Sequence, residues 1–164
     1  MKEAVIIDID GTLANISHRR PMLERFPVRN EDGLIIKHTK PDWNAFNEAI
    51  EHDTPNHWCV RLVQSLETET VFESPIDIIF LSGRAECYRD ITEKQINSWV
   101  GGNYELYMRP SKDYRPDTEI KEEIYNNEIK DKYNVLFCVD DRACVVKQWR
   151  KMGIVCLQCD EGDF

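Results

Sequence analysis

The sequence predicts an α/β protein with a doubly wound, Rossmann-like parallel sheet of about five strands and a small cap insertion after the first strand. Three observations predict it. Short continuous apolar runs recur along the chain, as in strands that are buried on both faces. Segments with helical periodicity separate these runs. Acidic and hydroxyl residues follow several runs directly, at the strand ends where ligands bind in folds of this class.

The predicted strands and helices alternate along the chain. The strands are AVIIDI (4–9), IDIIFLS (76–82), YELYM (104–108), VLFCVD (135–140) and IVCLQC (154–159). The helices are expected at 43–50, 55–66, 87–100, 118–133 and 144–152. Gly153 follows the last helical segment in the position that is typical of a helix end.

Residues 15–42 fit neither pattern. They contain three prolines and a turn-like NEDG segment, and over 15–40 six Lys/Arg face three Asp/Glu. We expect an insertion that folds over the site end of the sheet, and the alternative is an ordinary surface loop. Trp43 and Phe46 could stack on a base or belong to the core. Residues 1–164 are expected to form a single domain in which about 15–75 contribute the insertion and the first helices.

Composition and charge exclude several classes of protein. With 41% apolar and 31% charged residues, the chain is expected to be soluble and globular. No apolar run approaches the ~20 residues that cross a bilayer, and charge interrupts the N-terminal run, so we expect a cytoplasmic protein without a signal peptide or membrane contact. The net charge of −9 argues against broad, sequence-independent nucleic-acid binding, although it allows a local basic site and suits a bound divalent cation.

The six cysteines are expected to be reduced thiols. The segment CLQC (156–159) could be a metal or redox pair. However, the chain has no second CxxC, and positions three apart on a strand point to opposite faces. A structural role is therefore the favoured interpretation.

Reactive side chains gather at the predicted strand ends and on the helix before the fourth strand. In chain order they are Asp8, Asp10, Ser82, Arg84, Lys121, Asp140 and Asp141. Four carboxylates that converge repel one another unless a cation lies between them, and such oxygen-rich sites suit Mg²⁺. The sequence therefore predicts a magnesium site at this edge of the sheet.

The spacing of these residues suits phosphoryl transfer. An aspartate beside a cation stays ionised and can attack phosphorus, which gives an aspartyl-phosphate intermediate. A second carboxylate two residues on can protonate the leaving oxygen and then deprotonate water. Lys121 and a hydroxyl of Ser82 or Thr12 can hold the phosphoryl oxygens, and Gly11 permits a turn that brings backbone amides near them.

Each motif alone has a simpler explanation. The DxDG segment occurs in calcium loops, but here Thr12 and Arg19 stand where acidic ligands would follow. Asp140–Asp141 and Asp117 could be helix caps, and Asp117 is spaced for an ion pair with Lys121. The order of the motifs at successive strand ends is what favours a catalytic site.

The motifs DIDGT, the serine of LSGR, Lys121 and VDDR resemble, in this order, the four motifs of the haloacid dehalogenase-like phosphohydrolases. The stretches YMRPSKDYRPDTEIKEEIY and FCVDDRACVVKQWRKMGIVCLQCDEGDF are also similar to the 3′-phosphatase domain of bacteriophage-type polynucleotide kinases. The resemblance covers residues 4–20 and about 76–164 and is weak over 21–75.

The resemblance implies a role for each motif residue. Asp8 would be the nucleophile, Asp10 the general acid/base, and Lys121 a catalytic residue that also binds phosphate. The magnesium ligands would be Asp8, Asp140, Asp141 and the backbone carbonyl of Asp10. Family arginines would correspond to Arg84 and to either Arg19 or Arg20, and Asp117 would orient Lys121 or touch the substrate. The implied substrate-binding residues together are Thr12, Arg19, Arg20, Ser82, Gly83, Arg84 and Asp117.

The resemblance also implies a Mg²⁺-dependent phosphomonoesterase that removes 3′-phosphates from nucleic-acid ends or nucleotides, in a protein that a phage could encode. The chain contains no GxxxxGK phosphate loop, so it is expected to be a phosphatase without the kinase, and a separate kinase or ligase could be a partner. The alternative is a nucleotidase for free 5′-mononucleotides or another small phosphomonoester. A phospho-acceptor signalling domain would have its acidic pair before the acceptor aspartate, and a non-catalytic relative would lack some of these side chains. No oligomeric state is predicted.

Overall fold

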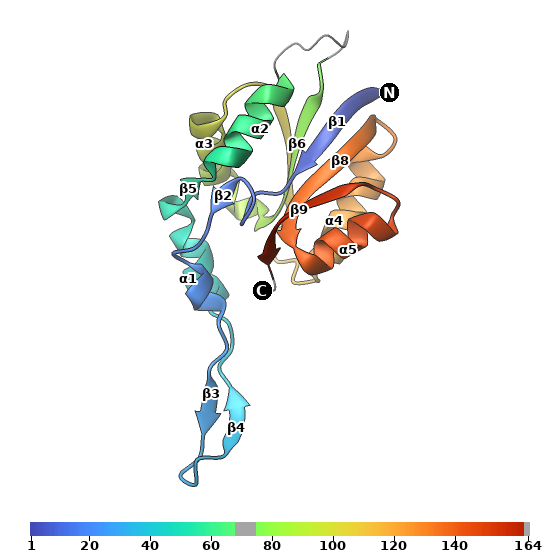
Figure 1. Cartoon of the computed structure of the whole chain (residues 1–164). Coiled ribbons are helices and arrows are strands. Elements are labelled where there is room, and N and C mark those ends of the chain that lie inside the picture. Colours follow the sequence, from blue (N-terminus) through green and yellow to red (C-terminus); the bar gives the residue numbers. More distant parts are fainter. Residues whose placement is uncertain (68–74, 163–164) are drawn as a thin grey trace.

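Five parallel strands form the central sheet of the computed structural model, which describes residues 1–67 and 75–162. The strand order is β7-β6-β1-β8-β9, with β1 in the middle (Figure 1). These strands are β1 (Lys2–Ile7), β6 (Asp77–Ala85), β7 (Tyr104–Arg109), β8 (Tyr133–Arg142) and β9 (Cys156–Gly162). All neighbouring pairs run parallel, which confirms the five predicted strands and the fold class.

Helices cover both faces of this sheet (Figure 1). Alternate residues of β1 point to opposite faces, so Val5 and Ile7 join one buried cluster while Ala4 and Ile6 join the other. The helices α2 (His57–Glu67) and α3 (Arg89–Trp99) cover the first cluster. The second cluster lies under α4 (Asp117–Ile124), its π-helical extension η4 (Tyr125–Ile129) and α5 (Ala143–Lys151). This two-sided core is why the strands lack polar alternation.

Several predicted limits differ from the structure by a few residues. The helix expected at 43–50 is α1 (Trp43–Glu48) followed by the 3-10 turn η2 (Ala49–His52), and a second 3-10 turn, η3 (Glu86–Tyr88), precedes α3. The helix expected to reach residue 133 ends with η4. Strands β6 and β8 continue beyond their predicted ends because irregular pairing, rather than a turn, follows the apolar run.

The cysteines behave as the sequence predicts. All six are free thiols. Cys156 is buried in one core cluster, whereas Cys159 packs against the other, so the CLQC pair is split between the two faces of β9. The interpretation of the pair as structural is supported by this placement.

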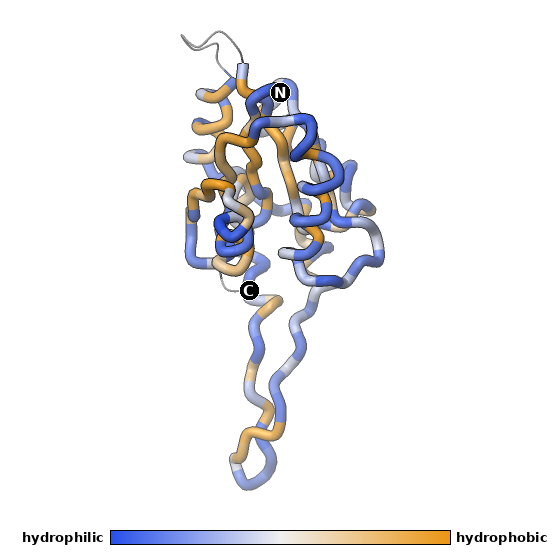
Figure 2. Tube along the Cα trace, turned by 90° about the vertical axis from the view of Figure 1, so that its right-hand side faces the viewer, coloured by the Kyte–Doolittle hydropathy of each residue, from blue (hydrophilic) through white to orange (hydrophobic). Residues whose placement is uncertain are grey.

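The segment between β1 and α2 forms two small antiparallel sheets that the sequence did not predict. Strands β2 (Ala14–Asn15) and β5 (Thr54–Pro55) pair beside the main sheet, and the 3-10 turn η1 (Arg20–Leu23) leads to the hairpin of β3 (Pro27–Arg29) and β4 (Ile35–His38). The segment was expected to fold over the site. Instead, η1 and α1 flank the site end of the sheet while the hairpin projects away from the body (Figures 1 and 2).

The two aromatic residues of α1 have different surroundings. Phe46 is buried in the core, whereas the Trp43 side chain is 49% exposed and contacts Phe46 edge-on. Of the predicted insertion, residues 68–74 lie outside the described part of the chain. Among the helices that the structure describes, none combines the length and the hydrophobicity that a membrane span requires.

Trp149 of α5 is the largest fully buried side chain and tests the second core cluster. Its ring lies 5.7 Å from that of Tyr125 in an edge-to-face arrangement. We expect Trp149→Ala to lower the free energy of unfolding by about 3–5 kcal/mol in urea denaturation, because it leaves a cavity. Trp58→Ala, at a side chain that is 47% exposed, is the matched control and should cost about 0.5 kcal/mol or less. Equal losses would contradict this description of the core.

Candidate active site

The carboxyl ends of β1, β6 and β8 bring the predicted site residues together. Asp8 directly follows β1 and still donates its backbone N–H to the carbonyl of Val139, 3.0 Å away. The pairing of β6 shifts register after Ser82, and that of β8 shifts after Asp140. Such bulges re-aim side chains near binding sites, and here they let consecutive residues 140 and 141 both face the site.

Three buried aspartates form an acidic cluster at this edge. Carboxylate oxygens of Asp8, Asp140 and Asp141 all lie within 4.8 Å of one another. Lys121 reaches the cluster from α4, and its Nζ donates to Asp8 Oδ1 at 2.6 Å and to Asp140 Oδ2 at 2.8 Å. One buried ammonium therefore faces three carboxylates, which leaves the cluster short of positive charge.

Burial and mutual repulsion shift the pKa values in this cluster. Burial raises the pKa of Asp8 well above its ordinary value, although Lys121 opposes that shift. Burial and the neighbouring Asp140 raise the pKa of Asp141 to about 7. Burial would lower the pKa of Lys121, but Asp140 and Asp8 outweigh it and raise the pKa, so this lysine stays charged.

The chain closes tightly around Asp141. Gly11 has φ +86°, and a Cβ at that position would overlap the Asp141 carboxylate, as would one at Gly162 of β9. Arg20 Nη2 donates to Asp141 Oδ2 at 3.1 Å. The other oxygen, Oδ1, is buried and has no hydrogen-bond partner among the described residues. An unsatisfied carboxylate oxygen within a crowded acidic cluster is the environment that a divalent cation would satisfy, so these three aspartates fit a metal site.

Asp10 belongs to a second, arginine-rich cluster. Its Oδ1 accepts from Arg19 Nη2 at 2.6 Å and from Arg84 Nε at 2.9 Å. Burial alone would raise the pKa of Asp10, but the two guanidinium groups outweigh it and lower the pKa. Asp8 and Asp10 are only two residues apart, but β1 ends at Ile7 and the two side chains have different partners.

Asp53, which the sequence analysis missed, connects the two arginines. Its carboxylate accepts two hydrogen bonds from Arg19, both at 2.7 Å, and one from Arg84 at 2.6 Å. Its side chain is fully buried, and burial raises its pKa while both arginines oppose that shift. Asp53 lies 34 residues from Arg19 and 31 from Arg84, so no local motif marks it.

Arg84 is held by further contacts on its other side. Its Nη1 donates to Thr92 Oγ1 at 3.2 Å and to Gln95 Oε1 at 2.8 Å, both on α3. Gln95 in turn donates to the carbonyl of Ile50 at 2.6 Å. Arg84 is therefore fixed between the insertion and α3.

Asp117 lies at the start of α4 and forms a third group. It accepts from Arg109 Nη2 at 3.2 Å and from Arg142 Nη1 at 3.3 Å, and its Oδ2 is 3.6 Å from Lys121 Nζ. The i, i+4 ion pair with Lys121 is present, as the spacing allowed. Neither Arg109 nor Arg142 was identified from the sequence, although both stand within segments that carry the resemblance. A Cβ at Gly83 would overlap the Asp117 carboxylate.

The remaining predicted residues, Arg19, Arg20 and Thr12, have different partners in the structure. Arg19 is fully buried and contacts Asp10, whereas Arg20 is part-exposed and contacts Asp141 and Asp160. Thr12 is buried with its hydroxyl 3.5 Å from Cys159 Sγ.

Ser82 is also fully buried at the site, where its Oγ accepts from the backbone N–H of Arg84 at 3.2 Å. The Asp10 side chain does not join the acidic cluster, so its role as a metal ligand through its backbone carbonyl stays a prediction.

Comparison with known proteins gives one family match. The model of the polynucleotide kinase PNKP phosphatase domain matches residues 30–164, a range that begins after Asp8 and Asp10. A protein named "Putative bifunctional polynucleotide kinase/RNA ligase", from Autographa californica nuclear polyhedrosis virus, is 30% identical over 148 residues, which is 85% of this chain and 20% of that protein.

Solved structures that resemble the whole chain include two of the Pnkp1/Rnl/Hen1 complex. A chain in the Pnkp1/Rnl/Hen1 RNA repair complex has a TM-score of 0.78, and a chain in a second structure of the Pnkp1/Rnl/Hen1 complex has a TM-score of 0.76. Both are 30% identical in sequence and cover 100% of this chain, which in turn spans 44% and 48% of their lengths. The chain thus spans less than half of each solved relative and about a fifth of the viral protein.

Asp53→Asn tests the connection between the two arginines. Removing this buried charge leaves two guanidinium groups with Asp10 as their shared carboxylate, so we expect the free energy of unfolding to fall by about 3 kcal/mol. Urea denaturation measures the change. Asp32→Asn, at an exposed position, is the matched control and should change stability by about 0.5 kcal/mol or less. If both substitutions had the same small effect, the ion pairs of Asp53 would not stabilise the site.

Proposed function

The chain belongs to the family of polynucleotide kinase PNKP phosphatase domains, and from this premise we propose that it removes 3′-phosphates from nucleic-acid ends through a covalent aspartyl-phosphate. The observation that carries the proposal is the placement of Asp8. Its carboxylate lies at a strand end, 2.6 Å from the Lys121 ammonium and within a cluster suited to a divalent cation. A nucleophile, a fixed positive charge and metal ligands at one point are what phosphoryl transfer requires.

In the first step, an oxygen of Asp8 attacks the phosphorus and the bond to the sugar 3′-oxygen breaks. Lys121 neutralises charge on Asp8, and it can contact the phosphoryl oxygens as the bond between Asp8 and phosphorus forms. The buried Ser82 hydroxyl provides a further donor at the same edge. Asp117 positions Lys121 through their 3.6 Å ion pair.

Mg²⁺ is the cation we propose for the acidic cluster, where Asp8, Asp140 and Asp141 would hold it. When bound, the ion supplies positive charge that offsets the negative charge of the phosphate and of the aspartates. The unsatisfied Asp141 Oδ1 is the feature of this chain that supports the assignment.

Asp10 is the residue that donates and accepts protons in the two steps. At neutral pH the arginines hold it as a carboxylate, the form that takes a proton from water when the phospho-enzyme is hydrolysed. In the first step it must donate a proton to the departing 3′-oxygen. The negative phosphoryl group of the substrate raises the pKa of a neighbouring carboxyl, so substrate binding favours the protonated form that this step needs.

The relatives' names support a nucleic-acid end as substrate, and the name of the viral relative includes kinase and ligase functions. This chain contains no GxxxxGK phosphate loop of the kind that a kinase uses. We propose that this phosphatase domain acts on the same nucleic-acid ends as a kinase or ligase, in line with the names of the relatives. Hydrolysis of free 5′-mononucleotides or other small phosphomonoesters is the second candidate, because the net charge of −9 disfavours long polyanions away from the site.

Binding of Mg²⁺ can be tested without turnover. Millimolar Mg²⁺ should raise the melting temperature of the wild-type protein by about 5 °C, because the ion binds only the folded carboxylate cluster. Asp141→Asn should abolish this shift. In the absence of metal, this variant should melt no lower than wild type, because the substitution relieves repulsion among buried carboxylates. Asp131→Asn, at an exposed position, should keep the full shift. An unchanged shift in Asp141→Asn would exclude this metal site.

The activity is tested with a matched pair of oligonucleotides that carry phosphate at the 3′ or the 5′ end. We expect phosphate release from the 3′ end only, with Mg²⁺ and not with EDTA. Asp8→Asn should lower the rate at least ~1,000-fold, while Asp131→Asn should retain it. Equal rates for Asp8→Asn and wild type would refute the nucleophile assignment. Release from free 5′-mononucleotides alone would favour the second candidate.

A further inference from the structure

The β3–β4 hairpin and its flanks, residues 25–40, form a projecting arm that is rooted at the active site (Figure 1). On one side the arm follows Arg19 and Arg20, which contact Asp10 and Asp141. On the other side it leads into α1, where Phe46 lies 4.1 Å beneath the Arg19 guanidinium and its carbonyl accepts a hydrogen bond from that group. A molecule that leaves the site past η1 and α1 would therefore meet the arm.

The part of the arm nearest the body has an unusual charge. We call residues 25–30 and 35–40 the stem. The stem holds four Lys/Arg and no Asp/Glu, in a chain whose net charge is −9. Arg25, Lys37 and Lys40 are exposed, and none of the ion pairs found in the described part of the chain involves them. Such uncompensated cations attract a polyanion.

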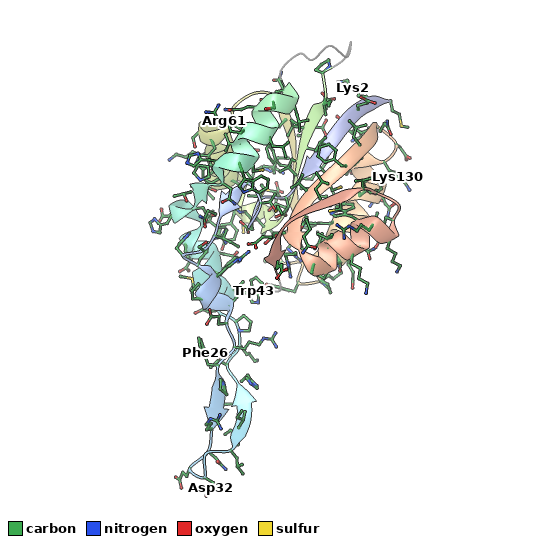
Figure 3. The ribbon with its side chains drawn as sticks, viewed as in Figure 1. Lys2, Phe26, Asp32, Trp43, Arg61 and Lys130 are labelled. Atoms are coloured by element: carbon green, nitrogen blue, oxygen red, sulfur yellow. The ribbon has the colours of Figure 1, made fainter. Side chains whose placement is uncertain are left out.

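Two exposed aromatic side chains accompany these cations. Phe26 is 54% exposed on the stem, and Trp43 is 49% exposed where the arm joins α1 (Figure 3). Large aromatic side chains are normally buried, as Phe46 is on the helix that also carries Trp43. Exposed rings beside unpaired cations are the combination that binds single-stranded nucleic acid, because bases stack on the rings while the cations meet phosphates.

The tip of the arm, residues 31–34, differs from the stem. Glu31 and Asp32 lie there, and Leu34 begins an exposed apolar stretch that continues into the stem as Ile35 and Ile36 (Figures 2 and 3). An apolar, acidic tip is suited to a protein rather than to a phosphate backbone. The stem, which is basic, aromatic and adjacent to the site, favours nucleic acid.

We propose that the stem, through Arg25, Lys37 and Lys40 with Phe26 and Trp43, binds the single-stranded segment of the polynucleotide whose 3′ end enters the active site. This inference rests on the proposed function and extends it from the terminal phosphate to the nucleotides that precede it. It also explains how a chain of net charge −9 could prefer a polymer end to a free nucleotide, because the binding surface is local.

The primary test measures binding without turnover. Fluorescently labelled 12-nucleotide strands of DNA and of RNA, each with a 3′-hydroxyl end, are titrated with protein at several salt concentrations and followed by anisotropy. The arm variant combines Arg25→Gln, Lys37→Gln and Lys40→Gln. The matched control combines Lys130→Gln, Lys147→Gln and Lys151→Gln, which remove the same charge from exposed positions after η4 and on α5.

We expect the arm variant to bind about tenfold more weakly at low salt and the slope of log K against log salt to fall by about 2, as for three lost phosphate contacts. The control variant should bind within about twofold of wild type. Trp43→Ala should weaken binding about tenfold, whereas Trp58→Ala, of similar exposure, should not. Comparison of the two strands shows whether DNA or RNA is preferred.

Equal binding by the arm and control variants would overturn the proposal and would leave the arm, with its apolar tip, as a surface for a protein partner. A second measurement compares phosphate release from a 3′-phosphorylated dinucleotide and a 3′-phosphorylated 12-mer. The arm variant should lose the advantage in kcat/KM of the longer substrate and keep the rate on the shorter one. If the wild type releases no phosphate from either substrate, the proposed function fails, whereas anisotropy still decides whether the stem binds the strand.

Discussion

The contact of Lys121 with Asp8 and Asp140 is the interaction on which the site depends. Three buried carboxylates within 4.8 Å of one another repel strongly when they are ionised, and nearby positive charge lowers that cost. Lys121 supplies one charge from α4. The position of that helix over the sheet, fixed by the second core cluster, is thus also what makes the strand-end aspartates tolerable.

The arginine cluster applies the same principle to the other half of the site. Arg19 and Arg84 come from the insertion and from β6, and both contact Asp10 and Asp53. Two buried cations and two carboxylates balance, so each guanidinium is held in one geometry. The insertion is therefore part of the site rather than an appendage to it, and the arm begins where these contacts end.

The segment 15–42 matches its sequence-based expectation in charge but not in shape. Its excess of positive charge was visible in the sequence, and two of its arginines do reach the site. Its shape was not visible, because a short hairpin with both faces exposed has no alternating apolar pattern that could distinguish it from a loop. The same limit applies to Trp43 and Phe46, whose identical helical periodicity concealed one exposed and one buried ring.

The sequence by itself determined the five strands, the two-sided core and the order of the reactive residues, because these follow from local apolar runs and from the residues that end them. Only the tertiary structure decided which charges meet. Asp53 contacts Arg84 across 31 residues and Arg142 contacts Asp117 across 25, and Arg19 and Arg20, adjacent in the chain, have different partners. The physical reason is that the partner of a buried charge depends on distances and geometry in the folded protein. The residues next to it in the sequence determine neither the distance nor the geometry.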